Sequence, residues 1–123
     1  MALAFDGSDS AYKALQLSLE LSEQAVWPLT VIIINSDSKK AAALIAQVEE
    51  ANQKDPDEPP IADCETIIIS GKEQDEIIKY IREGAVELMV MGAYGHNSLR
   101  ELFLGSTTAH VVNKSPIPVL LIR

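Results

Sequence analysis

Short runs of apolar residues recur along the chain and are separated by stretches with a different spacing. Five runs are mostly apolar, and several are rich in β-branched residues: residues 1–5, 29–34, 65–69, 87–91 and 117–122. Most of them stop at aspartate, asparagine, serine or glycine, which break an extended run. This pattern predicts five strands. Because a strand that is apolar on both faces needs cover on both sides, residues 29–34 in particular indicate a parallel sheet buried between helices.

Between the apolar runs, hydrophobic residues return at intervals of three and four, which is the spacing of a buried helix face. We predict helices over residues 10–24, over a segment that starts after Ser38, over residues 73–83 and over residues 106–113. The buried faces of the first three helices are expected to consist of Ala11, Ala14, Leu15, Leu17 and Leu21, then Ala41, Leu44, Ile45 and Val48, then Ile77, Ile78 and Ile81. Residues 53–63 combine acids with three prolines and are predicted to form a solvated connection.

The alternation of strands and helices predicts the fold class. Such repeats join parallel strands through right-handed crossovers, so we expect an α/β protein: an open, doubly wound five-stranded parallel sheet with helices on both faces. A length of 123 residues, without an internal repeat or linker, predicts one domain over residues 1–123. In such sheets a ligand lies beyond the carboxyl ends of the strands. Asp6 and Gly92 directly follow predicted strands and are expected to line that crevice.

Charge and composition narrow the class of partner. Ten Lys and Arg against eighteen Asp and Glu give a formal net charge of −8, so neither nucleic acid nor an anionic membrane surface is an expected partner. The longest apolar runs have about six residues, against the roughly 20 that span a bilayer, so no membrane insertion is expected. The single cysteine, Cys64, allows no internal disulfide, and we expect the protein in the cytoplasm.

The segment that carries candidate chemistry begins at Gly92. It reads Gly92-Ala93-Tyr94-Gly95, then nine residues, then Gly105-Ser106-Thr107. Glycines at a strand end let the backbone pass close to a ligand, and Gly105-Ser106 opens a helix whose free N–H groups suit a phosphate. The pattern therefore indicates a phosphate cradle. The alternative from spacing alone is that Gly92 and Gly95 are turn residues and that Ser106 caps its own helix.

These residues give the chain a resemblance to the universal stress protein family. The glycine pattern is preceded by the apolar residues 88–91 and followed by Ser115-Pro116-Ile117-Pro118 and an apolar strand. The opening Phe5-Asp6-Gly7-Ser8 also matches the family's first strand and turn, so the resemblance covers essentially the whole chain. Two departures are visible. The first strand is shorter than the family's usual one, and Phe5 is bulkier than the small aliphatic residue common before the aspartate.

The resemblance implies the strand order 3-2-1-4-5 and, as in many members, a homodimer. We expect the dimer to form through the last strand, from Ile117 to Ile122, because an apolar edge strand needs cover that a two-fold partner can supply. The family contains members that bind ATP and members that do not, and the glycine pattern is typical of the binders. Carried over residue by residue, the resemblance implies these nucleotide-binding positions: Asp6, Ile34, Met91, Gly92, Gly95, His96, Gly105, Ser106 and Thr107.

Each implied position has an expected role. Asp6 would face the ribose or a bound Mg²⁺, the backbone around Ile34 would meet the adenine, and Met91 would form part of an apolar wall. The expected ligand is ATP, or AMP or ADP, with Mg²⁺ carried by the nucleotide, because neither histidine has the spacing of a metal site. Arg100 is a candidate for a phosphate contact or a solvated surface group, and His110 is expected to be structural.

Together these observations favour an ATP-binding regulatory stress-response module that acts as a homodimer with an unknown protein partner. No residue beside the glycine segment is a clear general base, so we expect no catalytic residue and at most slow ATP hydrolysis. The alternative is a dimerising interaction module that does not bind nucleotide and in which the glycines are structural. An enzyme of the related adenine-nucleotide folds is disfavoured because the chain lacks a Gly-Lys-Ser/Thr phosphate loop.

Overall fold

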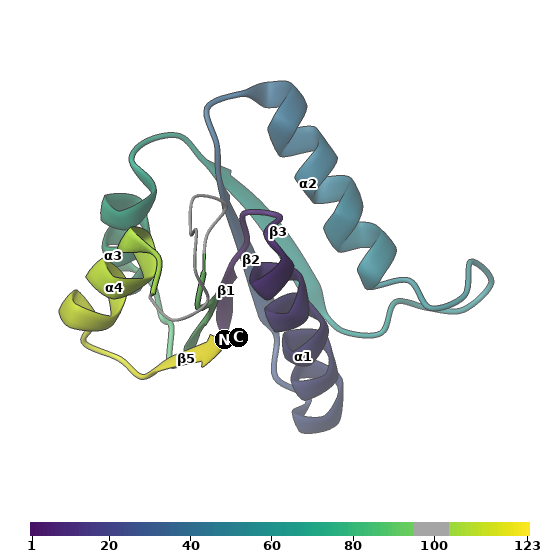
Figure 1. The fold of residues 1–123 in the computed structure, drawn as a ribbon. Helices are drawn as coiled ribbons and strands as arrows, with labels where there is room; N and C mark the ends of the chain where they lie inside the picture. Colours follow the sequence, from purple (N-terminus) through teal and green to yellow (C-terminus); the bar gives the residue numbers. More distant parts are fainter. Residues whose placement is uncertain (95–103) are drawn as a thin grey trace.

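The computed structural model describes residues 1–94 and 104–123 and shows strands and helices in strict alternation (Figure 1). The strands are β1 (Ala2–Ala4), β2 (Leu29–Ile34), β3 (Cys64–Ile69), β4 (Met89–Gly92) and β5 (Val119–Ile122). The helices are α1 (Asp9–Ala25), α2 (Ser38–Ala51), α3 (Glu73–Glu83) and α4 (Ser106–Lys114). The α/β class predicted from the apolar pattern is confirmed.

All the strand pairs are parallel, and the sheet has the order β3-β2-β1-β4-β5. Strand β1 lies at the centre, where Leu3 is level with Val31 of β2 on one side and Val90 of β4 on the other. Strands β3 and β5 form the two edges. The order that the resemblance implied is therefore confirmed, and the winding reverses at β1 and β4.

Helices α1 and α2 cover one face of the sheet, and α3 and α4 cover the other (Figure 1). Alternate residues of each strand enter the two cores, as the period of two along a strand requires. In β2, Val31 and Ile33 pack toward α1 and α2, whereas Ile32 packs toward α3 and α4. All three side chains are at most 1% exposed, which confirms the strand buried on both faces.

The buried face of α1 differs from the prediction. Ala11, Ala14 and Leu15 are buried as expected, but Leu17 and Leu21 are only half-buried. Small polar side chains take their place in the interior, together with one leucine: Ser10, Ser18, Leu19 and Ser22. Helix α1 packs on β4 and β5, and small side chains let a helix backbone come close to a sheet, so burial here follows side-chain size as well as polarity.

Several element boundaries shifted by one or two residues, and two of these shifts stand out. The predicted strand over residues 117–122 begins only at Val119, because both backbone groups of Ile117 bond to the Ser115 hydroxyl, which donates to Ile117 O and accepts from Ile117 N. Strand β4 begins at Met89 rather than at residue 87. Among the described helices none combines the length and apolar character that a membrane crossing needs.

Candidate functional site

The carboxyl ends of β1, β2 and β4 lie side by side at one edge of the sheet. Ala4 is aligned with Ile32 on one side and with Met91 on the other. Two residues beyond Ala4 the chain reaches Asp6, and two residues beyond Ile32 it reaches Ile34. The parallel arrangement thus brings together three segments that are far apart in the sequence, at the edge where ligands of doubly wound sheets bind.

The turn after β1 is tightly organised. Asp6 Oδ1 accepts a hydrogen bond from the Ser8 backbone N–H at 2.9 Å, and Gly7 between them has φ = 80°, a left-handed conformation that favours glycine. Ser8 is the N-cap of α1, and its hydroxyl accepts from Ala11 N at 3.3 Å. The turn therefore fixes the place of the Asp6 carboxyl group relative to α1.

The segment after β4 is tied to the first turn of α1. A Cβ atom added to Gly92 would clash with Ser10 Oγ and lie 2.6 Å from Ala11 N. Two residues later, the Tyr94 carbonyl accepts hydrogen bonds from Ser10 Oγ at 2.7 Å and from Ser8 Oγ at 3.2 Å. The close backbone approach that Gly92 permits in this structure is therefore an approach to α1.

The other end of the glycine segment returns to the same place. The Gly105 N–H donates to the Ala93 carbonyl at 3.1 Å, and Thr108 Oγ1 donates to the Gly92 carbonyl at 3.0 Å. These two bonds hold the N-terminus of α4 against the end of β4. Gly105, rather than Ser106, is the N-cap, so the alternative in which the Ser106 side chain caps its helix is wrong. Ser106 is exposed, and Thr107 is half-buried.

Seven of the nine implied positions can be placed. Asp6, Ile34, Met91, Gly92, Gly105, Ser106 and Thr107 all belong to the carboxyl edge of the sheet or to the N-terminus of α4. Ile34 and Met91 belong to the same apolar cluster under α3 and α4, and Met91 is only 4% exposed. Gly95 and His96 lie outside the described residues, as does Arg100.

Three hydroxyl side chains make bonds at this edge that were not predicted from the sequence. Ser10 and Thr108 are buried polar side chains whose hydroxyls bond to the segment after β4, and the Ser8 hydroxyl does so while it caps α1. Ser8 stood in a recognisable N-cap position. The bonds of Ser10 and Thr108 span 84 and 16 residues along the chain, so no local pattern indicated them.

Two basic residues of α4 lie away from its N-terminus. His110 and Lys114 belong to the later turns of α4 and line a groove against α3, away from the helix N-terminus. His110 Nε2 lies 3.9 Å from Asp75 Oδ1, which supplies a partner for the histidine expected to be structural. Among residues 1–94 and 104–123, no group of three or more His, Cys, Asp or Glu side chains could hold a metal ion.

Cys64 lies at the start of β3, half-buried and without a bonded partner cysteine. Burial, together with the nearby Asp63 carboxylate, raises the pKa of its thiol to about 11. A thiol of this kind is almost entirely protonated at neutral pH and is a poor nucleophile. We therefore interpret Cys64 as a small packing residue.

The order of the parallel sheet, with a polar turn and a helix N-terminus gathered at its carboxyl edge, defines a class: a doubly wound α/β protein of the Rossmann-like type. The sequence further matches the universal stress protein family over residues 1–123, and the chain belongs to that family.

Relatives of known sequence or structure agree with this assignment. The chain is 34% identical over 122 residues to universal stress protein Slr1230 of Synechocystis sp.. The match covers 98% of this chain and 41% of that protein. The chain therefore spans less than half the length of that relative. The structure of the universal stress protein UspA from Lactobacillus plantarum is 26% identical, with a TM-score of 0.75, and the match covers 99% of this chain and 96% of that one.

A further solved structure is that of a universal stress protein from Archaeoglobus fulgidus in complex with dAMP. It has a TM-score of 0.75 and 20% identity, and the match covers 99% of this chain and 95% of that one. At this identity the similarity establishes the shared fold.

Proposed function

We propose that this protein is an adenine-nucleotide-binding regulatory module of the universal stress protein family. The observation that carries the proposal is the pair of hydrogen bonds from Gly105 and Thr108 that fixes the N-terminus of α4 beside the end of β4, at the edge that also holds Asp6. The first backbone N–H groups of a helix have no partner inside the helix and lie at the positive end of its dipole. They suit the phosphates of ATP, ADP or AMP.

The other residues at this edge have chemistry that fits the rest of a nucleotide. Asp6 supplies a carboxyl group for a ribose hydroxyl or for Mg²⁺ carried by the phosphates. Ile34 and Met91 are apolar and lie in one cluster, so adenine would meet them at the Ile34 end, where the side chain is half-buried. Gly95 and His96 are proposed to complete the surroundings of the phosphates.

The proposal includes at most slow ATP hydrolysis. A general base has to reach the attacking water, and Asp6 is the one carboxylate among the nine proposed residues. Its Oδ1 atom already accepts the Ser8 N–H. We therefore propose that bound nucleotide changes how the protein meets a protein partner, and that turnover is not its main role. The Archaeoglobus fulgidus relative in complex with dAMP supports the class of ligand for the family.

Calorimetric titration tests this function. The nucleotide-stripped protein is titrated with ATP, with and without Mg²⁺, and with GTP as the control for base selectivity. We expect saturable binding that favours ATP. No heat at millimolar ATP, with the protein folded, would contradict the proposal.

Two valine variants of α4 locate the site. Gly105→Val adds a branched side chain at the N-cap beside the proposed phosphates, so ATP binding should be lost. Ala109→Val adds a comparable side chain at an exposed position one turn further along and should bind ATP as the wild type does. Equal binding by both variants would exclude the α4 N-terminus as the phosphate site.

A module that does not bind nucleotide remains the second candidate, and one observation favours it. Gly92 is required by its contact with α1 whether or not a ligand is present, because any side chain would clash with Ser10. Part of the glycine pattern thus has a purely structural reason. The titration above decides between the two candidates, since the second predicts a folded protein without nucleotide binding.

A further inference from the structure

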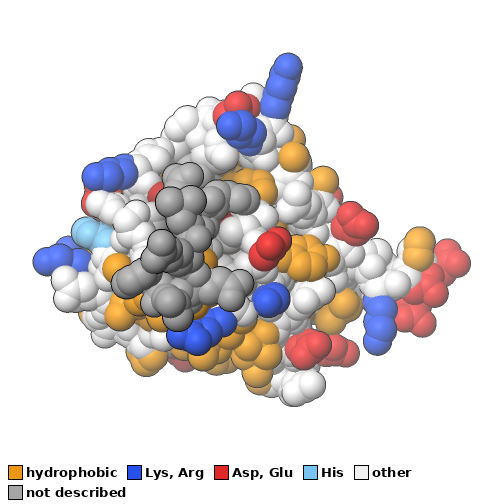
Figure 2. Space-filling view, viewed as in Figure 1, with side chains coloured by type: hydrophobic (Ala, Val, Ile, Leu, Met, Phe, Trp, Pro, Cys, Tyr) orange, Lys and Arg blue, Asp and Glu red, His pale blue; other side chains and the backbone are white. Residues whose placement is uncertain are grey.

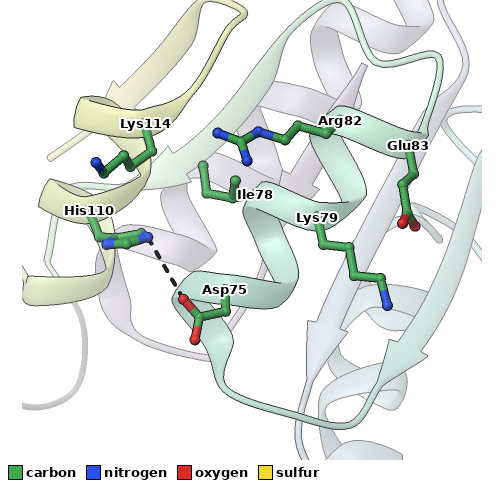
Figure 3. A pocket seen from close by; sticks show the side chains of 7 residues that line it. All are labelled: Asp75, Ile78, Lys79, Arg82, Glu83, His110 and Lys114. Atoms are coloured by element: carbon green, nitrogen blue, oxygen red, sulfur yellow. Dashed lines mark ion pairs between the residues drawn. The ribbon is translucent and has the colours of Figure 1, made fainter.

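A groove of about 470 Å³ lies between α3 and α4, away from the carboxyl edge of the sheet (Figure 3). It is lined by Asp75, Ile78, Lys79, Arg82, Glu83, His110 and Lys114. The side chain of Ile78 forms an apolar floor and is 7% exposed. The groove therefore combines an apolar base with a charged rim.

The rim of the groove concentrates positive charge in an acidic protein. Three of the ten Lys and Arg side chains line it, together with His110, in a chain of net charge −8. Figure 3 shows the Arg82 side chain extending from α3 past Ile78 toward α4, where Lys114 lies, whereas Lys79 and Glu83 point away. Asp75 is paired with His110. Within the described part of the chain, no ion pair joins Arg82 or Lys114 to an acidic side chain, so both cations of the rim are available to an acidic partner.

The chain also carries a segment of the opposite charge. The loop between α2 and β3 projects from the far end of the molecule, and acidic side chains gather on it (Figures 1 and 2). Residues 54–60 are all exposed and carry Asp55, Asp57 and Glu58 against one basic residue, Lys54, among three prolines. We call residues 54–60 the acidic loop.

The acidic loop is braced by its own hydrogen bonds. Asp57 N donates to Asp55 Oδ1 at 3.0 Å, and Glu58 N donates to the Asp55 carbonyl at 3.0 Å. The Gln53 side-chain amide donates to the carbonyls of Asp55 and Glu58. With its prolines, the loop is thus already ordered before any contact, which lowers the entropy that docking would cost. It offers carboxylates for a basic rim and proline rings for an apolar floor.

We propose that the groove between α3 and α4 receives the acidic loop of a second copy of this chain. One molecule cannot make this contact with itself, because the loop and the groove lie at opposite ends (Figure 1). The contact joins two different surfaces, so it is heterologous and links copies head to tail. Exposed ion pairs contribute little each, so the association is weak and sensitive to salt.

Sedimentation velocity of the whole chain tests the contact. We expect assembly that grows with protein concentration at about 20 mM salt and is lost at about 500 mM, where charges are screened over a few ångström. Arg82→Glu with Lys114→Glu should abolish this growth. Lys39→Glu with Lys40→Glu is the matched control, because it makes the same change in net charge at exposed positions on α2 and should assemble like the wild type.

A charge exchange identifies the two surfaces. Asp57→Lys with Glu58→Lys should also abolish growth when this variant is alone. Mixed with the Arg82→Glu, Lys114→Glu variant, it should restore salt-sensitive assembly, since each surface again faces its opposite charge. In the mixture, the ¹⁵N-labelled loop variant should show amide shift changes in α3 and α4 and in residues 54–60, and not in the middle of α1.

Three results would overturn the proposal. The first is a wild-type protein whose sedimentation does not respond to salt, which would mean that a second copy does not occupy the groove. The second is loss of assembly in the Lys39 and Lys40 control equal to that of the groove variant, which would show a general effect of charge. The third is a mixture that stays unassembled.

Discussion

At the scale of single residues, two buried serines of α1 differ in whether their hydroxyl groups have hydrogen-bond partners. Ser18 is fully buried, and its hydroxyl has no hydrogen-bond partner in the part of the chain that the structure describes. Ser22 lies one turn later and is 3% exposed, but its hydroxyl donates to the Trp27 carbonyl at 2.6 Å. The same side chain on the same helix face is thus satisfied at one position and unsatisfied at the other.

We therefore expect the two serines to respond in opposite directions to alanine. Ser18→Ala removes a buried hydroxyl without a partner and improves helix propensity, so the free energy of unfolding should rise by about 1 kcal/mol. Ser22→Ala leaves the Trp27 carbonyl without its donor, so the free energy of unfolding should fall by about 1 kcal/mol. Urea denaturation of both variants measures the difference, and a destabilised Ser18→Ala would show that its hydroxyl is satisfied in solution.

Val26 at the end of α1 has a backbone conformation that does not suit its side chain. It has φ = 50° and ψ = 46°, a left-handed conformation that β-branched side chains rarely adopt, and it is 88% exposed. Its backbone N–H donates to the Ser22 carbonyl, so the conformation serves as the helix cap.

Val26→Gly should raise the free energy of unfolding by about 1 kcal/mol, because glycine adopts this conformation without strain and keeps the capping bond. The neighbouring Ala25→Gly is the matched control and should lower stability, because Ala25 has a helical conformation. Thermal denaturation compares the two. A Val26→Gly variant less stable than the wild type would mean that the exposed valine makes a contribution beyond its backbone.

At the scale of elements, the sequence predicted most of the fold because its apolar pattern is locally consistent. Strand β2 and helix α3 begin and end at the predicted residues, and Ile77, Ile78 and Ile81 are buried as expected. The candidate site was harder to predict. Its position at the carboxyl edge followed from the topology, but the bonds of Ser10 and Thr108 depend on contacts between distant elements.

Helix α2 buries only half of the residues that its pattern predicts for the core. Of the four residues predicted to face the core, Ala41 and Val48 are buried, whereas Leu44 and Ile45 remain partly exposed. Helix α1, by contrast, buries seven residues. A helix that buries little apolar surface opens locally at a lower cost.

Hydrogen exchange should therefore separate the helices. We expect backbone amides in the middle of α2 to exchange at least about tenfold faster than those in the middle of α1, since local stability follows buried contacts. Exchange followed by NMR or by mass spectrometry of peptides measures this, with α3 as a second well-packed reference. Equal protection of α1 and α2 would indicate that a contact outside a single chain covers α2.

At the scale of the whole molecule, the open sheet leaves two edges, and we propose that β5 forms the homodimer. The carbonyls of Pro118 and Ile122 accept bonds from β4, at Met89 N and Ala93 N. By the period of two along a strand, the backbone groups of Val119 and Leu121 point to the outer edge. The four side chains of β5 are half-buried in the single chain, which leaves apolar surface for a partner.

Two proline substitutions test this edge. Leu121→Pro removes an outward N–H and leaves the bonds to β4 in place, so the protein should stay folded and become a monomer. Leu120→Pro removes an inward donor and should destabilise the fold itself. Sedimentation equilibrium measures the mass and circular dichroism the fold. A wild-type chain that is monomeric at high salt and high concentration would refute a dimer through β5.

The central place of β1 has a consequence for synthesis on the ribosome. Residues 2–4 pair with residues 30–32 on one side and with residues 89–91 on the other, and the second set is synthesised much later than the first. Until β4 is available, one edge of β1 has no strand beside it, and an unpaired strand edge can pair with another chain. Protection of growing chains by chaperones thus matters most before β4 leaves the exit tunnel.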